Sequence, residues 1–173
     1  HPSRTHSVRE LGRHFVAFLR EDCAALNTAL PWLAGLAELE RLEVEVFYAQ
    51  DNPLGAPLRG DALEAFFARP LGDVLDARCV LAESVTTHSD RYELTELKEQ
   101  LRDAEIVPSP MPRAEAYHWI VARDHATLEP AWYDATPLEA ALLAQLREDS
   151  AVTVEELLGL YCALRSDDPA APQ

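Results

Sequence analysis

Six histidines are the side chains that most readily bind a metal ion, and their spacing decides what they can do. His1, His6 and His14 lie near the start of the chain, but there is no His-Glu-x-x-His motif and no two histidines are four residues apart. Zinc sites commonly show such spacings, because the ligands must converge on one ion. We therefore predict no metal site and expect the histidines to be exposed polar side chains.

Motifs for nucleophilic catalysis and phosphate binding are also missing. No Gly-x-Ser-x-Gly elbow occurs, and none of the six glycines lies in a phosphate-binding loop. Cys23, Cys79 and Cys162 are odd in number and far apart, which suits reduced thiols better than disulfides. Cys79 falls in an expected strand and Cys162 on an apolar helix face, so we expect both to be buried. We predict no catalytic residue and no cofactor.

Thirty carboxylates against fifteen lysines and arginines give the chain a formal net charge of −15. A DNA-binding domain normally carries a basic stripe, so this balance argues against nucleic acid and against an anionic membrane surface. Four of the carboxylates, Glu38, Glu40, Glu43 and Glu45, fall on one expected helix, where a solvated face is the default interpretation. Glu40 lies nearest the apolar stripe, so we expect it to pair with Arg41 of a neighbour or with an N-terminal arginine.

Hydrophobic residues make up 48 % of the chain, which is enough for a globular core. The opening run HPSRTHSVREL lacks the apolar centre of a signal peptide, and no apolar run approaches the roughly 18 residues of a membrane span. We therefore expect a cytoplasmic protein that does not bind membranes.

Periodicity and breakers predict the elements of the first two thirds of the chain. Ser7 with Glu10 forms a capping box for the first helix, and Pro31 ends a break before the second. The predicted elements are helices over 7–22, 32–50 and 61–69, a bent strand over 74–87, a helix over 94–101 and a proline-rich connector over 107–112.

A hairpin follows the connector. Residues 116–123 alternate apolar and polar side chains, Asp124 and His125 are suited to the turn, and 127–133 returns. Pro130 lies in the returning strand. Because proline has no N–H to donate to a sheet, it indicates an edge position.

Two capping boxes, Thr136 with Glu139 and Thr153 with Glu156, start the closing helices. The order hairpin, helix, short turn, helix resembles a winged helix, whose usual use is to read DNA. Residues 136–173, however, carry two basic and seven acidic side chains, so electrostatics oppose DNA binding by this part of the fold.

The same element order has a second use, because an edge strand beside a helix can accept an extended peptide as an added strand. Aromatic residues concentrate in the hairpin, and an acidic surface would suit a peptide that carries Lys or Arg. The alternative is that these rings simply form the core. The candidate peptide-binding residues are Tyr117, Trp119, Val121, Trp132, Tyr133, Leu157 and Tyr161.

Residues 1–51 resemble a known family. The run HPSRTHSVRELGRHFVAFL looks like the end of the N-terminal helical domain of HvfC-like proteins, with His1-Pro2, then Leu11-Gly12, then a Phe-x-x-Phe-Leu helix from Phe15. The next stretch, LPWLAGLAELERLEVEVFYAQD, is similar to a second family signature. These motifs are helix patterns rather than catalytic signatures, and the family's longer helical N-terminus is missing here.

The resemblance implies a partner protein rather than an enzyme. Proteins of this family are often described as DNA-binding, and several accompany a multinuclear non-haem iron enzyme that modifies cysteines in ribosomally made peptides. The partner holds the precursor peptide through a domain like a peptide-recognition element and docks it on the enzyme. The candidate residues for contacting that enzyme are Phe15, Phe18, Trp32, Phe47 and Tyr48.

The sequence therefore predicts an α+β protein, with a helical part over 1–69, a winged-helix-like domain over 70–165 and a frayed tail over 166–173. Its favoured function is non-catalytic recognition of a precursor peptide, in a heterodimer with an iron-dependent modifying enzyme. The alternative is a winged-helix DNA-binding transcription regulator. A small enzyme in its own right is a third possibility, which no residue pattern supports.

Overall fold

The chain folds as a mixed α+β protein, seen here in a computed structural model that describes residues 8–50, 60–102, 107–124, 126–148 and 151–166. The helices are α1 (Val8–Glu21), α2 (Ala24–Ala29), α3 (Leu33–Phe47), α4 (Asp61–Phe67), α5 (Leu71–Leu75), α6 (Leu94–Arg102), α7 (Pro137–Glu148) and α8 (Val154–Ser166). The strands are β1 (Arg78–Cys79), β2 (Val85–Asp90), β3 (Tyr117–Arg123), β4 (Pro130–Asp134) and β5 (Val152–Thr153).

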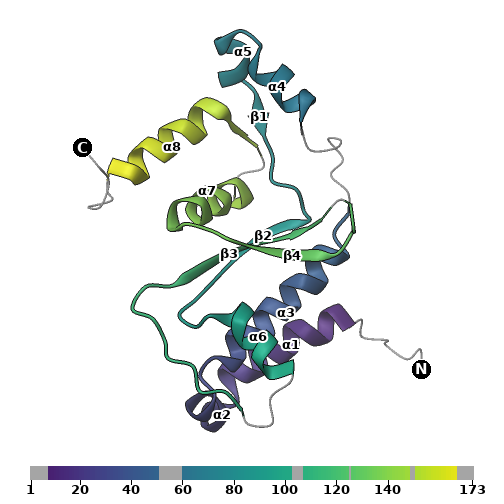
Figure 1. Ribbon diagram of the computed structural model, residues 1–173, viewed down its shortest axis with the longest axis vertical. Helices are drawn as coiled ribbons and strands as arrows, with labels where there is room; N and C mark the ends of the chain where they lie inside the picture. Colours follow the sequence, from purple (N-terminus) through teal and green to yellow (C-terminus); the bar gives the residue numbers. More distant parts are fainter. Residues whose placement is uncertain (1–7, 51–59, 103–106, 125, 149–150, 167–173) are drawn as a thin grey trace.

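A three-stranded antiparallel sheet in the order β2-β3-β4 lies at the middle of the molecule. Helix α3 packs on one face of this sheet, with α1 and α6 against α3, and α7 packs on the other face (Figure 1). The short strands β1 and β5 pair with each other near α4, α5 and α8 at the upper end of Figure 1.

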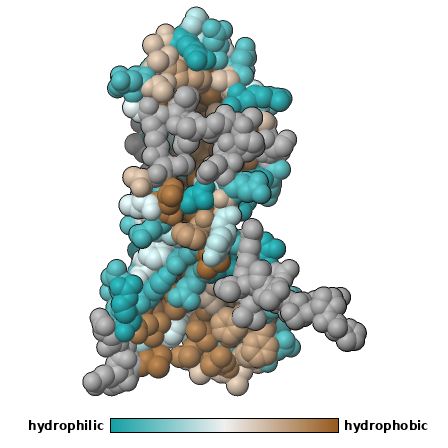
Figure 2. Space-filling model, turned by 90° about the vertical axis from the view of Figure 1, so that its right-hand side faces the viewer, coloured by the Kyte–Doolittle hydropathy of each residue, from teal (hydrophilic) through white to brown (hydrophobic). Residues whose placement is uncertain are grey.

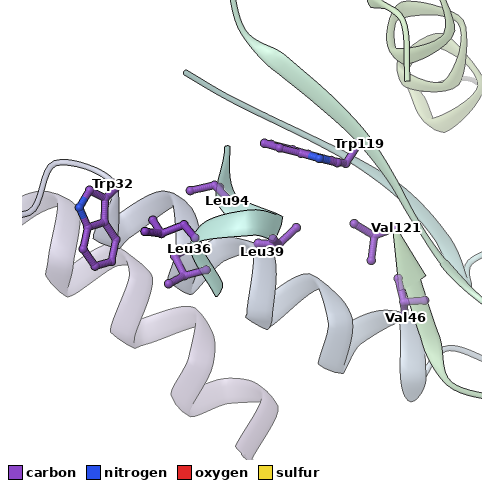
Figure 3. Packing of buried hydrophobic residues seen from close by; sticks show 8 residues of the cluster. Trp32, Leu36, Leu39, Val46, Leu94, Trp119 and Val121 are labelled. Atoms are coloured by element: carbon purple, nitrogen blue, oxygen red, sulfur yellow. The ribbon is translucent and has the colours of Figure 1, made fainter. Parts of the chain in front are cut away.

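The hydrophobic core lies between α3 and the sheet. Leu39 and Val46 of α3 face Val121 of β3, and Leu94 of α6 lies beside Leu36 (Figure 3). Val121 and Trp119 are almost fully buried because β3 is the central strand and α3 covers it. This single cluster takes residues from both sides of the boundary expected at residue 69, so the predicted helical part and the sheet share one core.

One ion pair joins α1 to α3, and two more lie within α3. Arg13 contacts Glu45 at 2.7 Å, and Arg41 contacts both Glu45 and Glu38 at 2.6 Å. The hydrogen bond from Arg41 lowers the pKa of Glu38. Burial alone would raise the pKa of Glu45, but its hydrogen bonds with Arg13 and Arg41 lower it. Within the described residues, the ion-pair partner of Glu40 is Lys98, at 3.9 Å, and the N-terminal arginines that could also pair with it lie outside this description.

The hairpin and the capping boxes form as predicted. Asp124 Oδ1 accepts hydrogen bonds from the N–H groups of Ala126 and Thr127, at 2.8 and 2.9 Å, and so shapes the turn between β3 and β4. Glu139 accepts from the Thr136 N–H at 2.8 Å, and Glu156 accepts from the Thr153 N–H at 2.8 Å. The capping box expected at Ser7 lies outside the described residues.

Two short helices and one strand break were not predicted. Helix α2 occupies part of the expected break, where Asn27 Nδ2 donates to Leu19 O at 2.6 Å and closes the end of α1. The single strand expected over 74–87 is wrong: Val74 is buried in α5, and the stretch after β1 turns before β2 begins. β-branched residues favour strands only weakly, so the burial of Val74 against neighbouring elements decided its conformation.

The close approach of α3 to β2 generates the first prediction. A Cβ atom on Gly35 would overlap the Asp90 carboxylate, whereas one on Gly159, in the middle of α8, meets open space. We expect Gly35→Ala to lower the free energy of unfolding by roughly 1–3 kcal/mol. Gly159→Ala should raise it by up to about 1 kcal/mol, because alanine favours the helix. Urea denaturation followed by circular dichroism measures both, and equal effects would contradict the packing at Gly35.

Candidate functional site

The predicted peptide-binding residues do not form one surface. Trp119 is 1 % exposed and Val121 0 %, so their side chains belong to the core and cannot contact a ligand. Tyr117 is half-buried and stacks on Trp119, with ring centroids 5.7 Å apart. The alternative interpretation, that hairpin aromatics form the core, thus holds for the side chains of the central strand.

Leu157 and Tyr161 lie on α8, apart from the hairpin. Both are half-buried, and α8 packs on α7, α5 and β5 rather than beside β4 (Figure 1). The structure therefore separates these two residues from Trp132 and Tyr133, which lie on the edge strand β4.

The predicted enzyme-contact residues are exposed, with one exception. Phe15 and Phe18 of α1 are each 49 % exposed, and Phe47 and Tyr48 at the end of α3 form an exposed edge-to-face pair. Trp32, by contrast, is 3 % exposed and belongs to the core, so it offers no contact surface. On the face shown in Figure 2, hydrophobic surface gathers at the lower end, which is the end formed by α1, α2 and α6 in Figure 1.

The candidate site is the open edge of β4. In an antiparallel pair, hydrogen-bonded and non-hydrogen-bonded residue pairs alternate. Two backbone hydrogen bonds show which pairs of β3 and β4 are the hydrogen-bonded ones. Ala135 N donates to His118 O at 2.9 Å, and Asp124 N donates to Glu129 O at 2.8 Å, so every second pair between them is also hydrogen-bonded. Trp132 and Asp134 therefore sit in non-hydrogen-bonded pairs, opposite Val121 and Trp119.

The backbone N–H and C=O groups of Trp132 and Asp134 consequently point away from β3, toward the free edge of the sheet. Pro130 occupies the same kind of position, so its missing N–H costs no hydrogen bond to β3. The sequence prediction that Pro130 marks an edge strand is confirmed. An extended peptide has donors and acceptors with the spacing needed to pair with such an edge.

Charged and aromatic groups flank this edge. Trp132 shares a face with Val121, and the Lys98 ammonium of α6 lies 4.6 Å from its ring centroid. Glu43 Oε1 accepts a hydrogen bond from Lys98 at 2.5 Å. Burial raises the pKa of Glu43, and the hydrogen bond from Lys98 acts in the opposite direction. Tyr133 lies on the other face and is 51 % exposed.

Two hollows lie near the edge strand, and only the second includes a β4 residue in its lining. One, of about 270 Å³, lies between α3 and α6 and is lined by Leu36, Glu40, Lys98, Leu101 and Arg102. The other, of about 550 Å³, lies at the end of β4, where Asp134 lines it together with Tyr117 and His118. Sequence reasoning missed Lys98, although one signal could have found it, because it is the only lysine of the chain and falls on an expected helix.

The opposite edge of the sheet, β2, differs from β4. Arg147 of α7 donates to Val85 O at 2.6 Å and so occupies part of that edge. A groove of about 510 Å³ lies nearby, lined by Arg13, Glu45, Tyr48 and Arg147 among others. Because an arginine already occupies its first outward carbonyl, β2 is a poorer acceptor for an added strand than β4.

Within the described residues, no three His, Cys, Asp or Glu side chains lie close enough together to hold a metal ion. His14 is exposed as expected, but His88 is half-buried and stacks on Trp119 at 5.9 Å, and burial lowers its pKa. Cys162 is exposed, so its expected burial is wrong, and Cys79 is half-buried. None of the helices in the described ranges is long and apolar enough to cross a membrane.

Two comparisons with known proteins find no relative. No protein-family model matches the chain, and a search of curated proteins gives no match either.

The burial of the aromatic residues generates the second prediction. Trp119→Ala should lower the free energy of unfolding by roughly 3–5 kcal/mol, because it leaves a cavity between α3 and the sheet. Tyr133→Ala, on the exposed edge strand, should cost less than about 1 kcal/mol. Guanidinium denaturation of the two variants gives both values. Equal stability of the two variants would contradict the placement of Trp119 in the core.

Proposed function

We propose that this protein is a non-catalytic recognition partner that binds an extended, basic segment of a ribosomally made precursor peptide. The segment adds as a strand to the edge of β4, and the protein presents it to a multinuclear non-haem iron enzyme. The outward backbone groups of Trp132 and Asp134 carry the proposal, because within the described residues no backbone hydrogen bond occupies them and exposed carboxylates lie beside them.

Charge favours a basic ligand over a nucleic acid. Glu129 and Asp134 are exposed on or beside β4, and the chain as a whole carries −15. A recognition helix for DNA needs basic side chains, whereas α8 opens with Glu155 and Glu156. The winged-helix-like order of hairpin, α7 and α8 is part of the proposal, with peptide rather than DNA as its ligand.

The enzyme partner rests on the resemblance of residues 1–51 to HvfC-like proteins, and the cytoplasmic location rests on the odd number of cysteines and the polar opening run. The exposed aromatic residues Phe15, Phe18, Phe47 and Tyr48 supply an apolar surface on α1 and α3 that suits such a heterodimer. Phe15 and Phe18 lie on α1, whereas Phe47 lies near the start of β4, because Arg123, which is paired with Pro130, donates to Phe47 O.

The third prediction tests strand addition at β4. Asp134→Pro removes one outward N–H and a carboxylate, whereas Asp134→Asn removes only the charge. With a fluorescein-labelled peptide of alternating lysine and threonine, we expect Asp134→Pro to weaken binding about tenfold and Asp134→Asn about threefold or less. Fluorescence anisotropy measures both affinities.

Equal affinities of the two variants would argue against a backbone contact at this position. A peptide of alternating glutamate and threonine serves as the charge control, and it should bind more weakly than the lysine peptide. If the protein instead shifts duplex DNA at physiological salt and ignores the lysine peptide, the transcription-regulator alternative replaces this proposal.

The fourth prediction concerns the enzyme partner. Co-expression with a multinuclear non-haem iron enzyme of the implied kind should give a complex that copurifies with iron. The double variant Phe15→Ser and Phe18→Ser should reduce recovery of that complex about tenfold or more, since it removes apolar contact area. Phe67→Ser is the matched control, because Phe67 is 62 % exposed on α4. Equal loss in both variants, or no complex with the unmodified chain, would count against the enzyme partner.

A further inference from the structure

An added strand at β4 would present its side chains in a fixed alternation. In an antiparallel ligand the residues opposite Trp132 and Asp134 would exchange backbone hydrogen bonds with them, whereas in a parallel ligand these bonds would go to the residues on either side. Side chains of directly opposed residues lie on the same face of a sheet. Since Trp132 is paired with Val121 and Asp134 with Trp119, that shared face is the one covered by α3 and α6.

The ligand residue opposite Trp132 would lie on the side of the sheet where Lys98, which lines the hollow between α3 and α6, contacts the Trp132 ring. Leu36 and Leu101 supply the apolar part of its lining and Glu40, Lys98 and Arg102 the charged part, and Lys98 also contacts the Trp132 ring. Glu43 neutralises the Lys98 ammonium, so that group already has its charge partner. A volume of about 270 Å³ accommodates one large apolar side chain.

The ligand residue opposite Asp134 meets a different environment. The Asp134 carboxylate is exposed at the end of β4, and no ion pair in the described part of the chain involves it. Opposite charges on directly opposed residues stabilise strand pairing. The strand geometry therefore puts an apolar position and a basic position two residues apart on one face of the ligand.

We propose that the protein selects an extended peptide in which a large apolar residue and a lysine or arginine are separated by one residue. The apolar side chain enters the hollow lined by Leu36 and Leu101, and the basic side chain pairs with Asp134. An antiparallel ligand has the basic residue first, and a parallel ligand has the apolar residue first. This inference rests on the proposed strand addition at β4 and names the ligand class of that site.

Three fluorescein-labelled threonine-rich heptapeptides of identical composition test the spacing. Two contain leucine and lysine separated by one threonine, in the two possible orders, and the third contains them adjacent. Adjacent residues point to opposite faces of a strand, so the third peptide cannot satisfy both contacts. We expect one of the spaced peptides to bind at least about threefold more tightly than the adjacent one. Equal affinity of all three overturns the inference.

Two protein variants test the contacts themselves. Leu101→Trp fills the hollow and should remove the advantage of leucine over alanine in the better peptide, whereas Gln100→Trp, on the exposed side of α6, should not. Asp134→Lys should reverse the charge preference, so that a glutamate peptide of the same spacing binds more tightly than the lysine peptide. This charge exchange decides the inference even if Leu101→Trp fails to fold, and an unchanged preference for lysine overturns it.

The results separate the two proposals. If Asp134→Pro weakens all three peptides equally and spacing has no effect, strand addition stands and the spacing rule fails. If Asp134→Pro changes no affinity, or if no peptide binds, strand addition fails and the spacing rule fails with it.

Discussion

The packing of α3 against the central strand is the contact on which the rest of the structure depends. Leu39 and Val46 of the helix meet Val121 and Trp119 of β3, and all four side chains are almost fully buried. Helix α1 is attached to the molecule through α3, and Gly35 lets α3 approach the end of β2 closely. Without α3, the sheet would expose Val121 and Trp119 to water, at a cost of several kcal/mol.

This packing also determines what remains for recognition. The core takes up the aromatic and β-branched side chains of β3, so β3 offers a ligand neither its edge nor its buried rings. The free groups lie one strand further out, where β4 turns backbone donors and acceptors toward solvent. Recognition of this kind depends on backbone geometry, with side chains adding selectivity, which agrees with the absence of a nucleophile motif in the sequence.

Local signals in the sequence predicted the elements that depend on local chemistry. Both closing helices start at their capping boxes. In each box the glutamate carboxylate accepts a hydrogen bond from the backbone N–H of the threonine three residues earlier, and this contact does not depend on distant elements. Pro130 indicated an edge because its missing N–H is a property of the residue itself. The prediction failed for Val74, which is buried in a helix instead of a strand, and for Cys162, which is exposed instead of buried. In both cases the packing of distant elements decides whether the side chain is buried. Glu40 and Glu43 are three residues apart on one helix, and no local pattern tells which of them forms the closer ion pair. The position of Lys98 on α6 decides this, because its Nζ lies 2.5 Å from Glu43 and 3.9 Å from Glu40.

The sequence by itself determined the α+β class, the acidic charge, the edge character of the strand that contains Pro130, and the lack of the common catalytic motifs. The tertiary structure decided which aromatic residues are core and which lie at the surface, and it placed Lys98, Leu101 and Trp132 beside one another. The physical reason is that capping, turn formation and charge act within a few residues. Burial depends instead on the contact of α3 with β3, and the place of Lys98 on that of α6 with β4; these segments lie far apart in the sequence, and no local pattern encodes their contacts.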